Sequence, residues 1–380
     1  MRIALDGIPL TEALTGVGHY TFELARHLAS SSGDEIFIVS PRRFVSTIAP
    51  ETSLTPSLHL TRASKNPLNR FWWSMGLPRY IRKHKIQVFH GTNFEVPLIG
   101  KCPSVITIHD LSMVLHPQTH ERRRVGRARK RLPMMARAAS MVITPTEAVR
   151  QEVHEYLQIP LDRIVTIPEA ARSVFRRQDL ARTMIVRKRL KITQPFVLYV
   201  GTIEPRKNLL SLVRAFEHVL SEGDSSLQLV IAGRKGWMVD DLFRHVKRSS
   251  AAKQIIFTGY LSDDDLCALY SSCALFVYVS LYEGFGLPPL EAMACGAPVI
   301  ASRIPSLSET VGEAAVLVAP TDVQELAHNI RSLLENEDLR MQLVRKGLQR
   351  TSELTWDRTA ELTRAVYDQA LARAAPLERY

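Results

Sequence analysis

The chain has 380 residues, of which 46% are hydrophobic and 23% charged, and its formal net charge is +11. At roughly 150 residues per domain this length predicts two domains, and the composition excludes a mostly disordered chain. The four cysteines lack C-x-x-C spacing, which argues against a disulfide framework or a thiolate metal site. The excess of positive charge favours a negatively charged partner such as a nucleotide, a phospholipid surface or a nucleic acid.

The first residues lead directly into an apolar strand pattern, which predicts a chain without a signal peptide. No apolar run approaches the roughly 20 residues needed to span a bilayer. We therefore expect a cytoplasmic protein that is either soluble or peripheral on the inner face of the membrane.

Short apolar runs alternate with helical patterns along almost the whole chain. The runs are rich in Val and Ile and do not alternate with polar residues, which is typical of parallel strands buried on both faces. Strands of this kind between helices predict α/β domains with doubly wound parallel sheets. The predicted strands are residues 2–5, 35–39, 88–90, 104–109, 141–144, 164–168, 196–200, 227–232, 254–258, 275–279, 298–301 and 315–318.

The strands fall into two series, which predict two Rossmann-like domains that face each other across a cleft. We expect the first domain at residues 1–175, a polar and basic linker at 176–194, and the second domain at 195–355. Residues 356–380 begin with a helical pattern, and we expect that helix to cross back to the first domain. Because ligands bind at the carboxyl ends of parallel strands, the loops after the strands should carry the chemistry.

A glycine-containing loop precedes a helix predicted at residues 20–30. Gly16 and Gly18 would let the backbone approach a ligand, and the helix N-terminus would attract an anion. A plain tight turn is the alternative. Thr21 stands where a dinucleotide fingerprint has its third glycine, so NAD binding has little support.

Two further pairs of polar residues follow predicted strands. His109 and Asp110 end a buried strand, where they could act on a polar ligand or only cap the sheet edge. Arg206 and Lys207 follow the first strand of the second domain. A guanidinium fork beside an ammonium group suits a diphosphate, although a solvated basic turn is the common alternative.

The segment 280–291 is the most informative part of the chain. Its two glycines free backbone N–H groups in a loop, and two adjacent prolines then begin a helix whose N-terminus favours a phosphate. Glu283 and Glu291 lie eight positions apart around this loop. Carboxylates repel phosphate, but they can accept hydrogen bonds from sugar hydroxyls on either side of it.

The pair Glu283 and Glu291 resembles the E-x7-E motif of the retaining glycosyltransferases of family 4, which have the GT-B fold. The surrounding segments resemble that family too: TGVG, the HD pair, GTIEPRKN, FTGYLSDDDL and EGFGLPPLEAMACGAPVIAS occur in order along nearly the whole chain. The chain looks most like bacterial enzymes that add mannose or related sugars to surface polysaccharide.

This resemblance implies roles for individual residues. The donor, a nucleotide-diphosphate sugar with GDP-mannose the best guess, would bind the second domain and reach across to the first, and no further cofactor is expected. His109 and Glu283 would be the catalytic residues near the transferring sugar. The donor-binding set would be Gly16, Gly18, Asp110, Arg206, Lys207, Gly259, Tyr260, Glu283, Gly284, Phe285, Gly286, Leu287 and Glu291.

The implied reaction is a front-face displacement that retains the anomeric configuration. Arg206, Lys207 and a helix dipole would stabilise the leaving diphosphate without a metal ion. Many relatives carry an arginine where this chain has Thr202, so Arg206 is expected to supply the guanidinium. The acidic run 263–265 follows Ser262, a good N-cap, and is therefore interpreted as the first turn of a helix rather than a metal site.

The acceptor would be a glycan or a lipid-linked oligosaccharide. Residues 122–131 contain seven Arg or Lys, which could attract anionic lipid or form an ordinary solvated face. Nucleic acid is not expected, because the basic run lacks interleaved aromatic residues. The aromatic run 71–73 could be a membrane anchor, but aromatic residues on a helix are more often core, and it is interpreted as core packing. Alternatives for the whole protein are a silent sugar-nucleotide scaffold or a GT-B-fold sugar-nucleotide epimerase.

Overall fold

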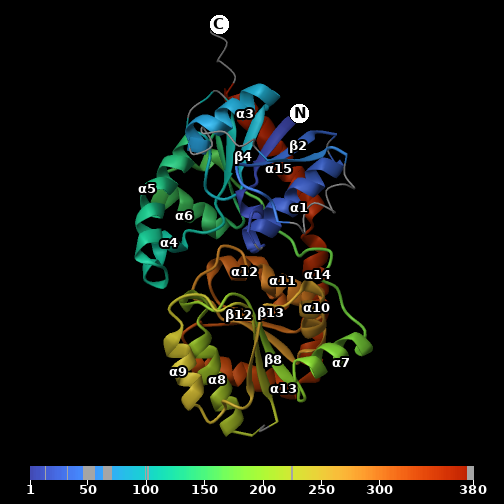
Figure 1. The fold of residues 1–380 in the computed structure, drawn as a ribbon. Coiled ribbons are helices and arrows are strands. Elements are labelled where there is room, and N and C mark those ends of the chain that lie inside the picture. Colours follow the sequence, from blue (N-terminus) through green and yellow to red (C-terminus); the bar gives the residue numbers. More distant parts are fainter. Residues whose placement is uncertain are drawn as a thin grey trace. The chain divides into compact units, whose positions relative to one another are not determined.

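A computed structural model describes most of the chain, and it divides into two compact units (Figure 1). Unit 1 comprises Met1–Leu111, Gly126–Glu169 and Thr355–Tyr380, and unit 2 comprises Ser112–Val125 and Ala170–Leu354. The structure describes residues 1–12, 14–31, 33–45, 56–62, 71–98, 100, 102–223 and 226–374.

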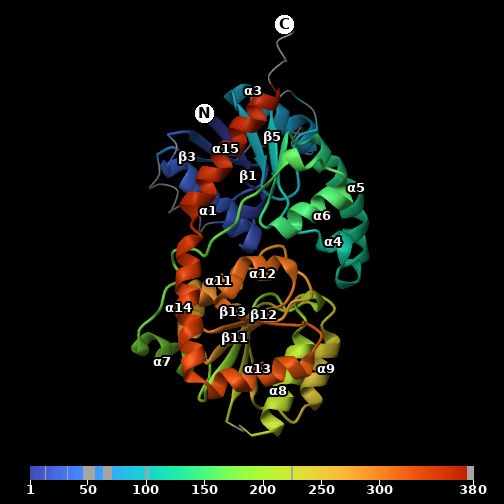
Figure 2. The ribbon, with the colours of Figure 1, turned by 180° about the vertical axis from the view of Figure 1, so that it is seen from behind.

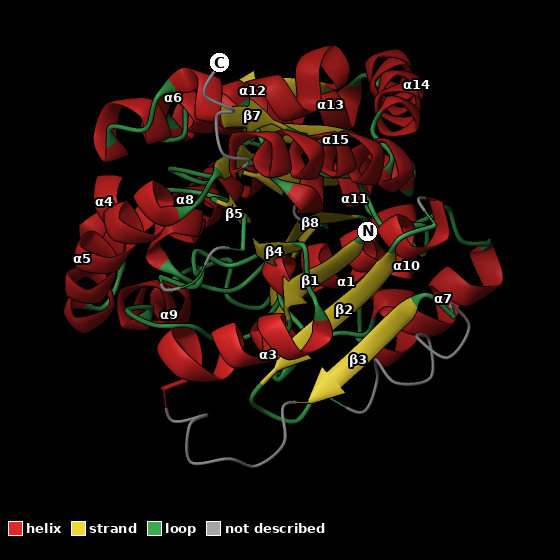
Figure 3. Cartoon of the chain, turned by 90° about the horizontal axis from the view of Figure 1, so that it is seen from above, coloured by secondary structure: helices red, strands yellow, loops and turns green. Residues whose placement is uncertain are grey.

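Unit 1 is built on a seven-stranded parallel sheet of order β3-β2-β1-β4-β5-β6-β7. Figure 3 shows β1, β2 and β3 side by side. The strands are β1 (Arg2–Asp6), β2 (Glu35–Ser40), β3 (Leu58–Arg62), β4 (Val88–Gly91), β5 (Ser104–Thr107), β6 (Met141–Thr144) and β7 (Ile164–Thr166). The helices between and after these strands are α1 (Gly16–Ser31), α3 (Leu77–His84), α4 (Ser112–Leu115), α5 (Arg122–Ala138), α6 (Glu147–Leu157) and α15 (Trp356–Ala374). Of these, α4 and the first residues of α5 belong to unit 2.

Unit 2 is built on a six-stranded parallel sheet of order β10-β9-β8-β11-β12-β13. The strands are β8 (Phe196–Val200), β9 (Gln228–Ala232), β10 (Ile255–Gly259), β11 (Leu275–Tyr278), β12 (Val299–Ser302) and β13 (Ala315–Val318). The helices are α7 (Leu180–Arg189), α8 (Leu209–Ser221), α9 (Asp240–Arg248), α10 (Asp263–Ser272), α11 (Leu287–Ala294), α12 (Pro305–Val311), α13 (Val323–Glu335) and α14 (Glu337–Glu353).

The prediction of α/β units with parallel sheets is confirmed. Each predicted strand coincides with an observed strand to within a few residues, because fully buried parallel strands must be apolar on both faces. The strand β3 was missed. It lies at the edge of its sheet, where its mixed sequence LHLTR is only partly buried and gives no continuous apolar run.

The first helix begins earlier than the sequence predicts. His19 N donates to Thr15 O (2.9 Å), so the chain is already helical at Gly16. Gly16 and Gly18 therefore lie in the first turn of α1 and not in a loop before it. A Cβ on Gly18 would lie 3.0 Å from the Leu14 side chain, which explains a small residue at that position.

In two segments the observed units and elements differ from the expected domain limits. Residues 112–125 belong to unit 2, where Trp237 Nε1 donates to Thr119 O (2.8 Å). The expected linker at 176–194 contains the helix α7.

The last helix, α15, packs against α1 in unit 1, and Figure 2 shows it running across the strands of that sheet. Its side chains Trp356 and Tyr367 are buried, and Arg364 forms an ion pair with the buried carboxylate of Asp34. None of the helices formed by the described residues is long and apolar enough to cross a membrane.

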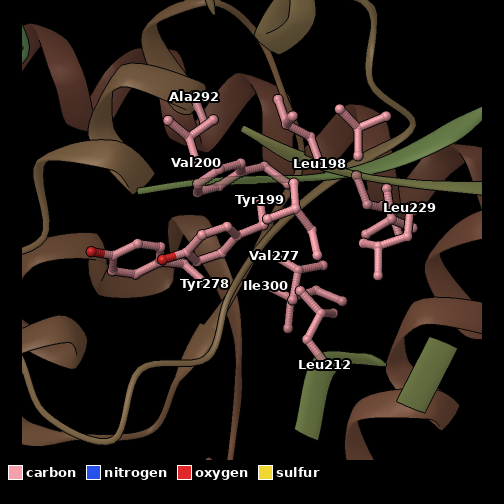
Figure 4. Close-up of a cluster of buried hydrophobic side chains, with 14 of the residues drawn as sticks. Leu198, Tyr199, Val200, Leu212, Leu229, Val277, Tyr278, Ala292 and Ile300 are labelled. Carbon is pink, nitrogen blue, oxygen red and sulfur yellow. The ribbon is translucent and has the colours of Figure 1, made fainter. Parts of the chain in front are cut away.

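A polar cluster lies beside the hydrophobic core of unit 2. Tyr199 of β8 and Tyr278 of β11 stack with their ring centroids 5.9 Å apart, among buried aliphatic side chains. Figure 4 shows both hydroxyl groups on the same side of this apolar cluster. The two adjacent strands therefore deliver polar groups to one place near their carboxyl ends.

Candidate active site

The polar cluster of unit 2 is built from the loops after β8 and β11, which are neighbours in the sheet. Leu281 N donates to Arg206 O (2.8 Å), and this backbone bond ties the two loops together. Asn208 Nδ2 donates to Val279 O (3.1 Å) beside it. The sheet order thus brings residues more than 70 positions apart in the sequence into contact.

Glu283 accepts hydrogen bonds from three side chains in this cluster. Arg206 Nη1 donates to Glu283 Oε2 (2.7 Å), and Lys207 Nζ (2.5 Å) and Tyr278 Oη (2.9 Å) donate to Oε1. Arg206 Nη2 also donates to Glu204 Oε1 (2.8 Å). Two carboxylates and two cations are therefore paired in one largely buried network, in which each ion is compensated by an opposite charge.

The electrostatics of this network keep Glu283 ionised. Burial alone would raise the pKa of Glu283, but the charges of Arg206 and Lys207 outweigh it and hold the pKa at about 2. Burial and the nearby guanidinium lower the pKa of Lys207. Burial, with the carboxylate of Glu283, raises the pKa of Tyr278, so its hydroxyl stays a hydrogen-bond donor.

The loop after Glu283 ends in the N-terminus of α11, as the two adjacent prolines predict. Gly286 has φ +106°, and a Cβ there would overlap the side chain of Leu307, so this turn requires glycine. The helix α12 fixes the loop from the other side. Ser306 Oγ donates to Glu283 O (2.5 Å), and Thr310 Oγ1 donates to Phe285 O (2.8 Å).

Glu291 lies in α11, in a different environment from Glu283. Its Oε2 accepts a hydrogen bond from Tyr270 Oη (3.2 Å). Arg172 lowers its pKa, but that guanidinium is paired with Asp263 (2.7 and 2.8 Å). Burial therefore dominates and raises the pKa of Glu291 to about 7.

In unit 1, His109 follows β5 and contacts acceptors on both sides of its ring. Nδ1 lies 2.9 Å from Glu169 Oε1, and Nε2 lies 2.9 Å from Thr92 O. Burial lowers the pKa of His109, but these acceptors outweigh burial and raise it. A protonated ring satisfies both contacts, because both nitrogens then carry a hydrogen. The ring of Tyr20 lies edge-on, 4.6 Å away between centroids.

A buried hydrogen-bond chain supports this region of unit 1. His90 lies at its centre, 2.7 Å from Tyr367 Oη and 2.8 Å from Thr107 Oγ1, and Thr107 in turn contacts Tyr20 Oη (2.9 Å). Burial lowers the pKa of His90 to about 3, so this ring is neutral. The chain connects α15, β4, β5 and α1 through paired polar groups.

The predicted site residues lie in both units. Gly16, Gly18, His109 and Asp110 belong to unit 1, and the other predicted residues belong to unit 2. Within unit 2 the structure brings Arg206, Lys207 and Glu283 into direct contact. The remaining positions lie at the end of β10 or around α11: Gly259, Tyr260, Gly284, Phe285, Gly286, Leu287 and Glu291.

Tyr260 is 60% exposed, and the Arg234 guanidinium lies 4.4 Å from its ring centroid. An exposed ring with a cation on one face is a platform on which a flat ligand could stack.

Sequence reasoning missed three polar residues of these clusters. Glu204 contacts Arg206 from two positions earlier, Tyr278 is the last residue of β11, and Glu169 lies after β7. Glu204 and Tyr278 could have been found as polar side chains at the ends of the two strands that carry the site. Glu169 lies 60 positions from His109, and nothing in the local sequence links the two.

Two other sequence interpretations can be compared with the structure. Ser262 Oγ accepts from Asp265 N (3.3 Å), so the acidic run 263–265 is the first turn of α10, as predicted. In the aromatic run 71–73, Trp72 is buried but Phe71 is 56% exposed. The core interpretation is therefore wrong for Phe71, which precedes the helical turn that points Trp72 inward.

Comparison with known proteins defines the class of protein to which this fold and site belong. Residues 14–171 match the family described as Glycosyltransferase Family 4, and residues 182–350 match the one described as Glycosyl transferases group 1. Over 379 residues the chain is 32% identical to the O-antigen chain mannosyltransferase B of Escherichia coli, covering 97% of this chain and 99% of that one. The chain belongs to the family 4 glycosyltransferases, which have the GT-B fold.

Solved structures agree on the fold. The Anabaena protein HepE, solved in complex with UDP-glucose, superimposes with a TM-score of 0.76 at 17% identity, over 96% of this chain and 98% of that one. Sucrose-phosphate synthase from Thermosynechococcus elongatus gives a TM-score of 0.74 at 23% identity, over 98% and 99%. The protein is a glycosyltransferase with mannosyltransferases of polysaccharide synthesis among its relatives.

Proposed function

We propose that this protein transfers mannose from GDP-mannose to a glycan or lipid-linked oligosaccharide during polysaccharide synthesis, with retention of the anomeric configuration. The observation that carries the proposal is the buried cluster of Arg206, Lys207 and Glu283, at strand ends where α/β sheets bind ligands. Mannose is favoured because the E. coli relative matched over its whole length is a mannosyltransferase.

In this proposal the cations of unit 2 act on the leaving group. Breaking the bond between the anomeric carbon and the phosphate oxygen leaves a diphosphate anion, which Arg206 and Lys207 stabilise together with the backbone N–H groups at the start of α11. These charges are already oriented by Glu283 and Glu204, so they need little reorganisation during the reaction. No metal ion is required for this role.

Glu283 and Glu291 are proposed to recognise hydroxyl groups. An ionised Glu283 accepts hydrogen bonds from the sugar, and Glu291 accepts them from the ribose. The acceptor hydroxyl attacks the anomeric carbon on the face that the phosphate leaves, and its proton passes to the departing phosphate oxygen. Bond breaking and bond formation on one face preserve the configuration.

His109 and Asp110 are proposed to contribute from unit 1. The imidazolium of His109, held by Glu169 and the Thr92 carbonyl, supplies a fixed group near the transferring sugar. Gly16 and Gly18 at the N-terminus of α1 offer backbone N–H groups to the diphosphate. All four are therefore proposed as donor-binding positions of unit 1.

The basic run 122–131 in α5 is proposed to bind an anionic membrane surface that carries the lipid-linked acceptor. Arg122, Arg123, Arg127, Arg129 and Lys130 are exposed on this helix. Clustered Lys and Arg attract the negative surface of a bilayer. A protein that acts on lipid-linked acceptors from the cytoplasm would gain local substrate concentration in this way.

The proposal is tested by thermal-shift measurements with a panel of nucleotide sugars, followed by transfer to a mannose-terminated acceptor and NMR of the product. GDP-mannose should raise the melting temperature most, and the new bond should keep the α configuration of the donor. A larger stabilisation by another donor would contradict mannose as the transferred sugar. A product with inverted configuration would contradict the retaining mechanism. Binding without turnover would indicate a silent scaffold.

A further inference from the structure

The helix α7 of unit 2 exposes three large apolar side chains. Leu180 is 81% exposed, Met184 68% and Ile185 60%. Figures 1 and 2 show α7 at the periphery of unit 2, and Figure 1 shows it near α10, against which it packs. Scattered exposed apolar residues are normal in proteins, but three on one face of a short helix form a patch.

The orientation of this face is fixed by the opposite side of the helix. Val186 and Thr183 are buried, and Val186 belongs to the core of unit 2. Asp265 of α10 pairs with Arg182 (3.4 Å) and Arg189 (2.7 Å), one near each end of α7. These contacts hold α7 against α10, so its apolar side chains cannot turn inward without breaking them.

The segment that carries the apolar face is rich in positive charge. Residues 176–191 contain seven Arg or Lys and a single acid, Asp179. The carboxylate of Asp179 caps the helix by accepting from Arg182 N (2.8 Å). At 3.6 residues per turn, Leu180, Met184 and Lys188 lie in one row. The exposed cations of this segment are Arg176, Arg177, Lys188, Arg189 and Lys191, of which Arg189 is paired with Asp265.

We propose that α7 is a docking helix for an anionic bilayer surface, with Leu180, Met184 and Ile185 inserted among the headgroups and the exposed cations of the segment other than Arg189 paired with lipid phosphates. Helices that lie in the membrane interface combine an apolar face with flanking Lys and Arg. The charge complementarity favours a bilayer, whose negative charge is spread around any point of insertion, over a protein groove. This inference concerns binding only and does not depend on the proposed reaction.

The contribution of α7 differs in kind from that of α5. On α5 the exposed face is cationic, with Met134 as its exposed large apolar residue. Charge attraction of that type weakens as salt shortens the Debye length from about 10 Å at 0.1 M to about 3 Å at 1 M. Apolar insertion does not weaken with salt in this way. The two contributions can therefore be separated in one assay.

The experiment is co-sedimentation of the full chain with vesicles of phosphatidylcholine alone and of phosphatidylcholine with phosphatidylglycerol, at low and high salt. The test variant is Leu180→Ser/Met184→Ser/Ile185→Ser. The matched control is Met341→Ser/Leu348→Ser on α14, whose side chains are 50% and 45% exposed. Far-UV circular dichroism and thermal unfolding check that each variant folds, and size-exclusion chromatography with light scattering measures association between copies.

We expect the wild type to bind the anionic vesicles with a salt-resistant fraction, and the triple serine variant to lose that fraction by at least about tenfold. The control variant should bind like the wild type. The proposal is overturned if the wild type does not bind anionic vesicles, or if the triple variant binds them as well as the wild type does. It is also overturned if the wild type is a dimer that the triple variant dissociates, since α7 would then contact a second copy.

Discussion

Glu283 accepts hydrogen bonds from two cations and a tyrosine hydroxyl, so the cluster around it is paired before any ligand arrives. In the proposed function, the diphosphate of the donor would share Arg206 and Lys207 with this carboxylate. The benefit is orientation, because the cations are held in place by Glu283 and Glu204 instead of by the substrate. Removal of one charge should therefore reduce the stability and activity of such a site more than an exchange that keeps the charge.

Glu291 should make the stability of the protein depend on pH. Its pKa is about 7 in the folded state and 4.5 ordinarily, so the folded state holds the proton more tightly. The folded state therefore loses stability as pH rises from about 4.5 to about 7, by roughly 3 kcal/mol in all. Glu291→Gln removes this loss, so urea unfolding should show its advantage over the wild type growing between pH 5 and pH 8.

A matched control for that experiment is Glu335→Gln, because Glu335 is exposed at the end of α13. The difference in stability between the Glu335→Gln variant and the wild type should stay constant over the same pH range. A Glu291→Gln difference that is constant with pH would show that the carboxyl of Glu291 titrates normally.

Glu169 should set the protonation of His109. The contact of 2.9 Å between them favours the charged ring, so Glu169→Gln should lower the pKa of His109. The stability that this pair adds is present at low pH and is lost as pH rises through the folded pKa of His109. NMR titration of the histidine ring carbons measures the change directly.

Glu155→Gln, an exposed exchange in unit 1, is the matched control and should leave the His109 titration unchanged. Two results would contradict the pairing: a His109 pKa below 6.5 in the wild type, or the same value in the Glu169→Gln variant.

At the scale of elements, the sequence predicts the buried strands, but it does not predict which residues from different strands come into contact. A strand such as Phe196–Val200 is apolar throughout because both of its faces are covered, so its sequence identifies it alone. The polar residues after β8 and β11 could be placed at strand ends for the same reason. The edge strand β3 and the early start of α1 depend on weaker local preferences, and the contact of His109 with Glu169 depends on sheet order.

The loop before α11 depends on one backbone conformation. Gly286 has φ +106°, and Gly286→Ala adds both backbone strain and a clash with Leu307. We expect a loss of about 1–3 kcal/mol in the free energy of unfolding, and weaker donor binding because the N-terminus of α11 shifts. Chemical denaturation and donor titration measure the two effects.

Gly126→Ala in α5 is the control, since a Cβ there meets open space and its φ is ordinary. It should stabilise the protein slightly, because alanine favours a helix more than glycine. Equal effects of the two substitutions would contradict the role assigned to the Gly286 turn.

At the scale of the whole molecule, each unit has its own sheet and core, and neither carries the full set of proposed residues. The cations and the two motif glutamates lie in unit 2, and His109 lies in unit 1. The family and the fold are established for the entire chain by relatives that match almost all of it.

The most direct measurement is the rate of GDP release from GDP-mannose, with and without a mannosylated acceptor, for the wild type and Glu283→Gln. Arg206→Lys, which keeps the charge but loses the fork, serves as a second variant, and Glu335→Gln serves as the control. We predict acceptor-stimulated release by the wild type and a loss of about 100-fold or more in Glu283→Gln that still unfolds cooperatively. Wild-type rates in Glu283→Gln would contradict the assignment of this cluster as the donor site.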